Sequence, residues 1–167
     1  MRRIAVRRTI GADPETVWEA LADIAAHVEW MADARAIRFT SDRTEGVGTA
    51  FVCDTKVGPL RLRDRMEVTE WDPERAMAVR HVGLVTGEGR FTLHARRGGT
   101  ELAWEETLQF PWWIPGLPAA AVLRMIWRGN LRRFERTLPP DATGGRGARR
   151  RARRWRRGGR GPASSAS

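Results

Sequence analysis

Helical spacing of apolar residues occurs at only two places in this chain, and this distribution limits the fold more than any other feature. A short helical pattern follows Asp13-Pro14, and a long one occupies about 118–138. Between them, alternating segments are separated by turns such as Trp71-Asp72-Pro73 and Gly98-Gly99. Successive strands joined by short turns pair antiparallel, and the apolar face of their sheet must be covered. The sequence therefore predicts an α+β fold with one long helix laid on an antiparallel sheet.

The first helical pattern is short and follows a strand. Residues 3–10 alternate between apolar and polar side chains, which is typical of a half-buried strand. Asp13 is a good helix N-cap, and Pro14 suits the first helical position because its missing N–H would be unpaired there anyway. We expect this helix to break near Ala25-Ala26 and a second short helix to continue through Trp30.

Six further segments alternate with a period of two and are separated by turn residues. The clearest spans 60–70, where Leu60, Leu62, Asp64, Met66 and Val68 share one face. With residues 3–10, these segments predict a curved sheet of about seven strands. Gly87-Glu88-Gly89 is interpreted as a turn. The six predicted strands are 36–39, 49–55, 60–70, 76–82, 89–96 and 100–110.

The second helical pattern begins near Pro118 and supplies the cover for the sheet. Its length, about 20 residues at about 1.5 Å each, gives roughly 30 Å, enough to cross the sheet. Pro139-Pro140 ends it, because proline cannot continue a helix. The residues of its apolar stripe step by three or four and are Ala120, Leu123, Trp127, Leu131, Phe134 and Leu138.

The charge divides the chain into two parts. Of its 30 basic and 20 acidic residues, 9 arginines and a single aspartate lie in 139–167. We therefore predict a folded domain over 1–138 and a disordered Arg-rich tail over 139–167, because the composition of the tail cannot bury a core. The segment 146–160 could bind nucleic-acid phosphates or an anionic membrane, with Trp155 at either surface, or it could have no function.

Several features indicate the compartment. Cys53 is the only cysteine, so no intramolecular disulfide can form, and a reducing compartment is expected. The N-terminus carries arginines but no apolar signal-peptide core. The longest uncharged apolar stretch, 108–123, holds three prolines and is shorter than the ~18–20 residues that span a bilayer. We therefore expect a cytoplasmic protein without a transmembrane segment.

The order of these elements and their motifs resembles the START-like (SRPBCC) superfamily, in particular its polyketide cyclase/dehydrase-like branch. The likeness covers roughly residues 2–138 and depends on the order and spacing of turns and caps rather than on any single motif. The segments that carry it are Ala12 to Trp18, Leu21-Ala22-Asp23, Trp30, Gly46-Val47-Gly48-Thr49, Val68 to Pro73 and Gly99 to Leu102.

The resemblance implies a helix-grip fold, in which a curved sheet wraps around the C-terminal helix and encloses a cavity. Members of this superfamily include lipid carriers, aromatase/cyclases and quinone-binding proteins, so the fold alone does not decide the activity. We expect a carrier or sensor that binds a lipid, quinone, polyketide or aromatic metabolite. The alternative is an enzyme, a cyclase/dehydratase. The residues expected to line the cavity are Phe51, Leu62, Met66, Val79, Phe91, Leu93, Trp104, Leu123 and Trp127.

Three polar residues interrupt the apolar face of the predicted sheet: Asp64, His81 and Glu106. A carboxylate buried in an apolar pocket has a raised pKa, and a nearby imidazole could share its proton, which is the material of acid/base catalysis. Alternatively, each could pair with a residue of opposite charge that balances its own charge, and have no catalytic role. A β-bulge would turn Glu105 inward instead of Glu106.

Other candidate sites are weaker. His27, His81 and His94 lie far apart and match no metal-ligand spacing, so neither a metal nor a cofactor is predicted. Cys53 is interpreted as a core residue. Trp112-Trp113 begins a rigid apolar loop before the long helix, and it could form a lid, a membrane-contacting edge or plain packing.

Overall fold

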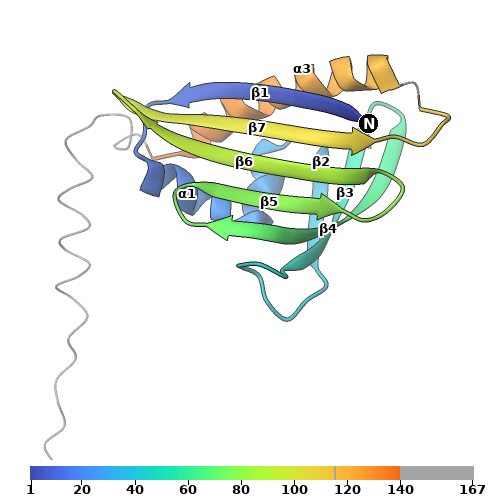
Figure 1. The fold of residues 1–167 in the computed structure, drawn as a ribbon, viewed down its shortest axis with the longest axis horizontal. Helices are drawn as coiled ribbons and strands as arrows, with labels where there is room; N and C mark the ends of the chain where they lie inside the picture. The colour runs from blue at the N-terminus through green and yellow to red at the C-terminus, as the bar shows by residue number, and fades with distance from the viewer. Residues whose placement is uncertain (115, 140–167) are drawn as a thin grey trace, which may run out of the picture.

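The computed structural model describes residues 1–114 and 116–139, and they form one curved antiparallel sheet with helices packed on one face (Figure 1). The seven strands lie in the order β1-β7-β6-β5-β4-β3-β2. The α+β fold class predicted from the sequence is thereby confirmed. In chain order the elements are β1 (Arg2–Ile10), α1 (Pro14–Ala22), the 3-10 helix η1 (Ile24–Ala26), α2 (His27–Trp30), β2 (Ala34–Phe39), β3 (Ala50–Val57), β4 (Leu60–Asp72), β5 (Ala76–His81), β6 (Thr86–Arg96), β7 (Gly99–Gln109) and α3 (Gly116–Thr137).

Two aspartates define the short helices that follow β1. The Asp13 side chain accepts a hydrogen bond of 2.8 Å from the backbone N–H of Thr16 and caps α1. The Asp23 side chain accepts one of 3.2 Å from the N–H of Ala26 and caps η1. The break therefore begins at Asp23, slightly before the position predicted, because this second cap restarts the chain as a 3-10 turn that leads into α2.

In β4, the alternation of side chains between the two faces of the sheet is interrupted near the end of the strand. The register with β5 shifts between Val68 and Glu70, as a β-bulge does. Before the shift Val68 is fully buried; after it Glu70 faces outward and pairs with Arg90 at 2.6 Å. Trp71 therefore turns inward, where its ring lies edge-on to Trp18 at 5.2 Å. The simple alternation predicted over 60–70 does not continue through this bulge.

The helix α3 is fixed to the rest of the molecule by a buried amide as well as by its apolar stripe. It packs against β1 and α2. Asn130 is fully buried; its side-chain oxygen accepts from the N–H of Ala32 at 3.0 Å, and its amide donates to Asp33 at 2.8 Å. Arg8 of β1 pairs with Glu135 at the far end of the helix. These contacts hold α3 at a fixed position over the concave face.

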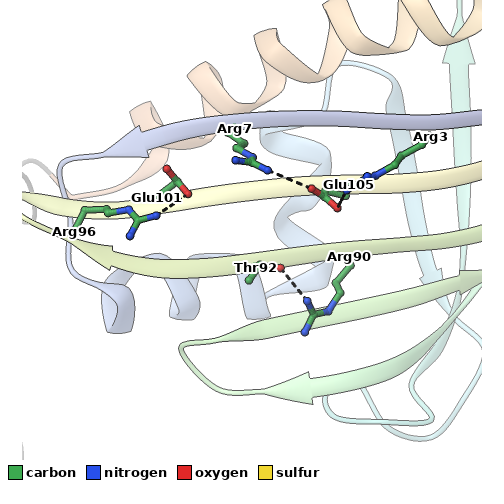
Figure 2. Close-up of polar contacts among 7 residues, drawn as sticks. All are labelled: Arg3, Arg7, Arg90, Thr92, Arg96, Glu101 and Glu105. Atoms are coloured by element: carbon green, nitrogen blue, oxygen red, sulfur yellow. Dashed lines mark hydrogen bonds and ion pairs between the residues drawn. The ribbon is translucent and has the colours of Figure 1, made fainter.

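The outer face of the sheet carries exposed ion pairs between neighbouring strands (Figure 2). Glu105 of β7 accepts from Arg3 of β1 at 2.8 Å and lies 3.7 Å from Arg7. Arg96 of β6 pairs with Glu101 of β7 at 3.2 Å. Such cross-strand pairs suit a solvated face, so the sheet has one charged and one apolar side.

The predicted tail over 139–167, including the segment 146–160, lies outside the described residues except for Pro139. None of the helices in the described part combines the length and the apolar character that a bilayer-spanning helix requires.

Candidate functional site

A cavity of about 390 Å³ lies between the concave face of the sheet and α3. Most of its wall is apolar, and seven of the nine residues expected to line it do so. The strands β3, β4, β5 and β7 supply one side, and α3 supplies the other. Those seven are Phe51, Leu62, Met66, Val79, Trp104, Leu123 and Trp127. Whether they bind a ligand stays a prediction.

Phe91 and Leu93 are not part of the cavity wall. Both are buried, but they belong to the core beneath the short helices. The ring of Phe91 lies edge-on to those of His27 and Trp30 of α2, at 6.4 Å from each. Leu93 lies further along β6, the strand that α1 contacts. Strand alternation identifies the inner face, but it does not say which part of that face the helices cover.

The three polar residues singled out in the sequence come together in the cavity wall. Asp64, His81 and Glu106 project inward from β4, β5 and β7. The His81 Nδ1 lies 2.6 Å from Asp64 Oδ2, and its Nε2 lies 3.5 Å from Glu106 Oε2. The imidazole therefore stands between two carboxylates, one at each ring nitrogen. We call these three residues the polar cluster.

A glycine makes this arrangement possible. The strand β6 separates His81 from Glu106 and presents Gly89 directly opposite Glu106. A Cβ at Gly89 would lie only 3.0 Å from Glu106 Cγ and Oε1. The missing side chain at Gly89 therefore leaves room for the Glu106 side chain to lie over β6 toward His81. The prediction of a turn at Gly87-Glu88-Gly89 is wrong, because these residues belong to β6.

The choice between Glu105 and Glu106 is also resolved. β7 pairs with β1 and β6 without a register shift, so no bulge reverses its facing. Glu106 is buried and accepts a hydrogen bond of 2.8 Å from the indole N–H of Trp104. Glu105 lies on the outer face with Arg3. Of the two glutamates, the one in the cavity wall is therefore Glu106.

Burial and charge set the protonation of the cluster in a specific way. Burial raises the pKa of Glu106 from 4.5 to about 7, although the charge of His81 and the Trp104 hydrogen bond act in the opposite direction. Burial also disfavours the charged form of His81, but the hydrogen bond to Asp64 and the charges of Glu106 and Asp64 outweigh it. The pKa of His81 is therefore above its ordinary value of 6.5.

Two buried atoms of the cluster lack a hydrogen-bond partner among the described residues. These are His81 Nε2 and Asp64 Oδ1. An unpaired polar atom away from water costs about 1–3 kcal/mol, and native proteins rarely leave one without a reason. Because both residues line the cavity, a polar group placed there could satisfy them.

Two tryptophans form an aromatic wall beside the polar cluster. The rings of Trp104 and Trp127 are stacked, with centroids 4.4 Å apart and planes 18° from parallel. Trp104 thus stacks on Trp127 of α3 on one side and donates a hydrogen bond to Glu106 on the other. This contact links the position of the helix to the position of the carboxylate.

The remaining candidates do not extend this chemistry. Burial lowers the pKa of His27 to about 4, so at neutral pH it is uncharged and donates through Nε2 to the Leu21 carbonyl at 2.8 Å. Burial raises the pKa of Cys53 to about 11, as expected for an inert core thiol. The carboxylates of Asp64 and Glu106 face opposite ring nitrogens of His81 rather than one shared point, so the cluster does not resemble a metal-ligand set.

Comparison with known proteins identifies relatives of this chain. The sequence pattern of the family described as polyketide cyclase/dehydrase and lipid transport matches residues 1–139. The chain is 30% identical over 132 residues to the uncharacterized protein Rv2574 of Mycobacterium tuberculosis, with 75% of each chain covered.

Solved structures share the fold at low sequence identity. A START superfamily protein from Mycobacterium smegmatis matches with a TM-score of 0.70 and 11% identity over 81% of this chain and 96% of the other. The ZhuI aromatase/cyclase from a Streptomyces species matches with a TM-score of 0.67 and 18% identity over 80% and 91%. Because the pattern matches residues 1–139, the chain belongs to the polyketide cyclase/dehydrase and lipid transport family, and these solved structures share its fold.

Proposed function

We propose that this protein binds a small, largely apolar molecule that carries an oxygen-bearing polar group. The single observation that carries the proposal is an apolar cavity with an unpartnered imidazole nitrogen, His81 Nε2, buried in its wall. A volume of about 390 Å³ lies in the range of small-molecule pockets. The classes that fit are lipids, quinones, polyketides and aromatic metabolites, as a carrier or sensor in this family would bind.

The walls favour one orientation of such a ligand. Its apolar body would lie along Trp104, Trp127 and the side chains of β3 and β4, where water is displaced from apolar surface. Its oxygen would lie to one side of His81 Nε2 and Glu106 Oε2, which are 3.5 Å apart, within hydrogen-bond reach of both. A protonated His81 donates to such an oxygen, and Glu106 donates or accepts according to its protonation.

Native mass spectrometry of the full chain from its own host, followed by extraction and identification of any bound molecule, tests the binding. We expect a bound apolar ligand at one per chain. Val79→Trp fills the cavity wall and should abolish retention, whereas Ala78→Trp, the neighbouring residue on the opposite face of β5, should retain it. Equal retention by the two variants would contradict binding in this cavity.

A second candidate function is acid/base catalysis of a cyclase/dehydratase type. It is favoured by the geometry of the polar cluster, where Glu106 with a pKa of about 7 lies beside His81. A group with a pKa near the working pH can both take and give a proton. In loss of water from a β-hydroxy carbonyl compound, one residue would remove the α proton and the other would protonate the departing hydroxyl.

The substitution Glu106→Gln separates the two functions because it keeps the shape of the side chain and removes its titration. A binding protein should keep its affinity for the extracted ligand within about tenfold, because one hydrogen bond of a neutral group is changed. An enzyme should lose turnover by about 10²–10⁴, the usual contribution of a general acid or base. Product formation from the extracted ligand, followed by mass spectrometry, provides the readout.

A further inference from the structure

A third carboxylate lines the cavity in addition to the two of the polar cluster. It belongs to Asp33, in the connection between α2 and β2. Its position is fixed, because its side chain accepts from the buried Asn130 amide at 2.8 Å and its main-chain carbonyl accepts from the Lys56 N–H at 2.8 Å. Asn130 carries no charge, so this contact holds the Asp33 carboxylate without neutralising it.

Few cations offset these carboxylates. The two of the polar cluster share a single ion-pair partner among the described residues, His81. Arg63 is part of the cavity wall, but its side chain is 72% exposed and pairs with Asp54 at 3.3 Å. His27, the other imidazole of the wall, is uncharged at neutral pH, because burial lowers its pKa to about 4. Three carboxyl groups therefore share one imidazole, and the cavity is negative even when Glu106 is protonated.

This charge disfavours an anionic ligand. A carboxylate or phosphate placed in the cavity would add a like charge in a site removed from water, and like charges at close range disfavour the ionised form. The imidazole of His81 cannot offset the added charge, because Asp64 and Glu106 already lie at its two nitrogens. The polar end of the ligand is therefore expected to be uncharged or cationic.

The two unpaired atoms of the polar cluster distinguish between these possibilities. His81 Nε2 donates when the ring is protonated and then needs an acceptor, whereas the carboxylate oxygen Asp64 Oδ1 needs a donor. A hydroxyl group both accepts and donates, so it can accept from Nε2 and donate to a carboxylate oxygen such as Glu106 Oε2. A carbonyl only accepts. An ammonium group only donates and would lie beside the charged imidazole.

We propose that the cavity selects ligands whose polar end is an uncharged hydroxyl group, as in an apolar alcohol or phenol, and rejects apolar acids of the same size. Asp33 contributes to the selection through its charge, and the polar cluster contributes through both charge and hydrogen bonding. The selection rests on the proposed function, since it concerns the ligand of the same cavity. It narrows the ligand classes given above to those with a free hydroxyl, and it excludes free fatty acids and lipids whose phosphate would enter the cavity.

Isothermal titration calorimetry of the full chain with matched probes tests the selection. The probes are 2-naphthylmethanol, 2-naphthoate and 2-naphthylmethylammonium, which share one apolar body and are uncharged, negative and positive at neutral pH. We expect the alcohol to bind about tenfold or more tightly than the carboxylate, since repulsion worth one pKa unit is a tenfold change in affinity. The alcohol should also bind more tightly than the ammonium. Equal or tighter binding of either ion would overturn the proposal.

A pair of charge variants tests the part assigned to Asp33. Asp33→Asn keeps the shape of the side chain and an oxygen that accepts from Asn130, but it removes one negative charge from the wall. The affinity for 2-naphthoate should rise by about fivefold or more, and that for 2-naphthylmethanol should change by less than about twofold. Glu105→Gln removes the same charge from the outer face, where water screens it, and should change neither affinity. A gain for 2-naphthoate in both variants, or in neither, would overturn the proposal.

The failure of the selection is distinguishable from the failure of the proposed function. If 2-naphthoate binds as tightly as 2-naphthylmethanol, binding in the cavity stands and only the selection is wrong. If native mass spectrometry finds no ligand and none of the three probes binds, both fail. Val79→Trp, which fills the cavity wall, should abolish binding of 2-naphthylmethanol. Binding retained in that variant would place the probe outside the cavity and would overturn the proposal.

Discussion

Two adjacent residues of β7 show how strongly the two faces of this sheet differ. Glu105 points outward, and Glu106 points into the cavity. Hydrogen bonding to Arg3 holds the pKa of Glu105 below its ordinary value. Burial raises the pKa of Glu106 to about 7. The pKa values of two neighbouring glutamates on one strand are thus shifted in opposite directions.

The difference shows how burial changes the cost of carrying a charge in this molecule. On the outer face, water screens each charge, so a carboxylate and an arginine pair at little cost and with little gain. On the inner face, removing a carboxylate from water is costly, and the charge of His81 only partly compensates Glu106. A buried carboxylate with a strongly shifted pKa is therefore a candidate functional residue.

The largest expected effect comes from removing the cation of the inner face. His81→Ala leaves Asp64 and Glu106 in a buried site without the imidazole between them. Breaking a buried pair in this way destabilises a protein by about 4 kcal/mol. Urea denaturation above pH 7 should show this loss in the free energy of unfolding. The loss should shrink as the pH falls below about 7, where protonation makes Glu106 neutral.

The matched control removes the cation of the outer face. Arg3→Ala takes the partner from Glu105 but leaves Arg7 nearby, and we expect a loss below about 0.5 kcal/mol. Similar losses for the two variants would break the distinction between the faces.

The second effect is a pH dependence that Glu106 imposes on folding. Its pKa is about 7 in the folded protein and 4.5 ordinarily, so the folded state binds its proton more tightly. The resulting stability is fully present below pH 4.5 and is lost as the pH rises through about 7. This difference between the two pKa values corresponds to about 3 kcal/mol in the free energy of unfolding. Because the pKa of His81 is also raised, its contribution falls in the same direction.

Comparing wild type with Glu106→Gln isolates the part due to Glu106. The free energy of unfolding of the wild type should decline across this pH range, and that of the variant should decline less. The difference between the two profiles is the measurement. If both profiles decline equally, Glu106 is ionised in the folded protein at neutral pH, and the comparison with Glu105 loses its basis.

Most of the fold follows from local patterns in the sequence. Asp13-Pro14 starts a helix for reasons contained in the two residues themselves, and Pro139 follows the end of another. Alternation along β4 places Leu62, Asp64 and Met66 on one face, and pairing of neighbours in the chain then orders the strands. Such local rules suffice here because every strand but β1 pairs with a strand next to it in sequence.

The site is harder to predict because it depends on contacts between elements. Alternation brings Asp64, His81 and Glu106 to the inner face, but their mutual distances depend on the register of four strands. The sequence around Gly89 predicts a turn, since a glycine that makes room for a side chain of the next strand looks the same as a turn glycine. Phe91 faces inward as predicted, yet α2 covers it.

The third effect concerns the space that Gly89 leaves for Glu106. Gly89→Ala would place a Cβ 3.0 Å from Oε1 of Glu106, the oxygen that Trp104 holds. We expect a loss of about 1 kcal/mol, because forced side-chain shifts outweigh the reduced chain entropy that alanine normally brings. Thermal unfolding followed by circular dichroism measures it.

The same substitution at a position without crowding should have the opposite sign. A Cβ added at Gly129 in α3 would meet no atom within 4 Å outside the helix's own backbone, and Gly129→Ala should stabilise the protein by up to about 1 kcal/mol. A stabilised Gly89→Ala variant would mean that Glu106 moves away freely and that its contact with Trp104 is dispensable.

The smallest expected effect concerns Glu105 on the outer face of the sheet. Glu105→Gln removes a carboxylate whose pKa is lowered by Arg3, so its contribution is present above pH 4.5 and is lost as the pH falls below that value. This sign is opposite to that of Glu106. Because the pair is exposed, the change in the free energy of unfolding should stay below about 0.5 kcal/mol and should disappear in high salt. Denaturation at neutral and acidic pH, each at low and high salt, measures it. A loss that persists in high salt would mean that the outer face shields its charges from water, and the contrast between Glu105 and Glu106 would then be one of degree.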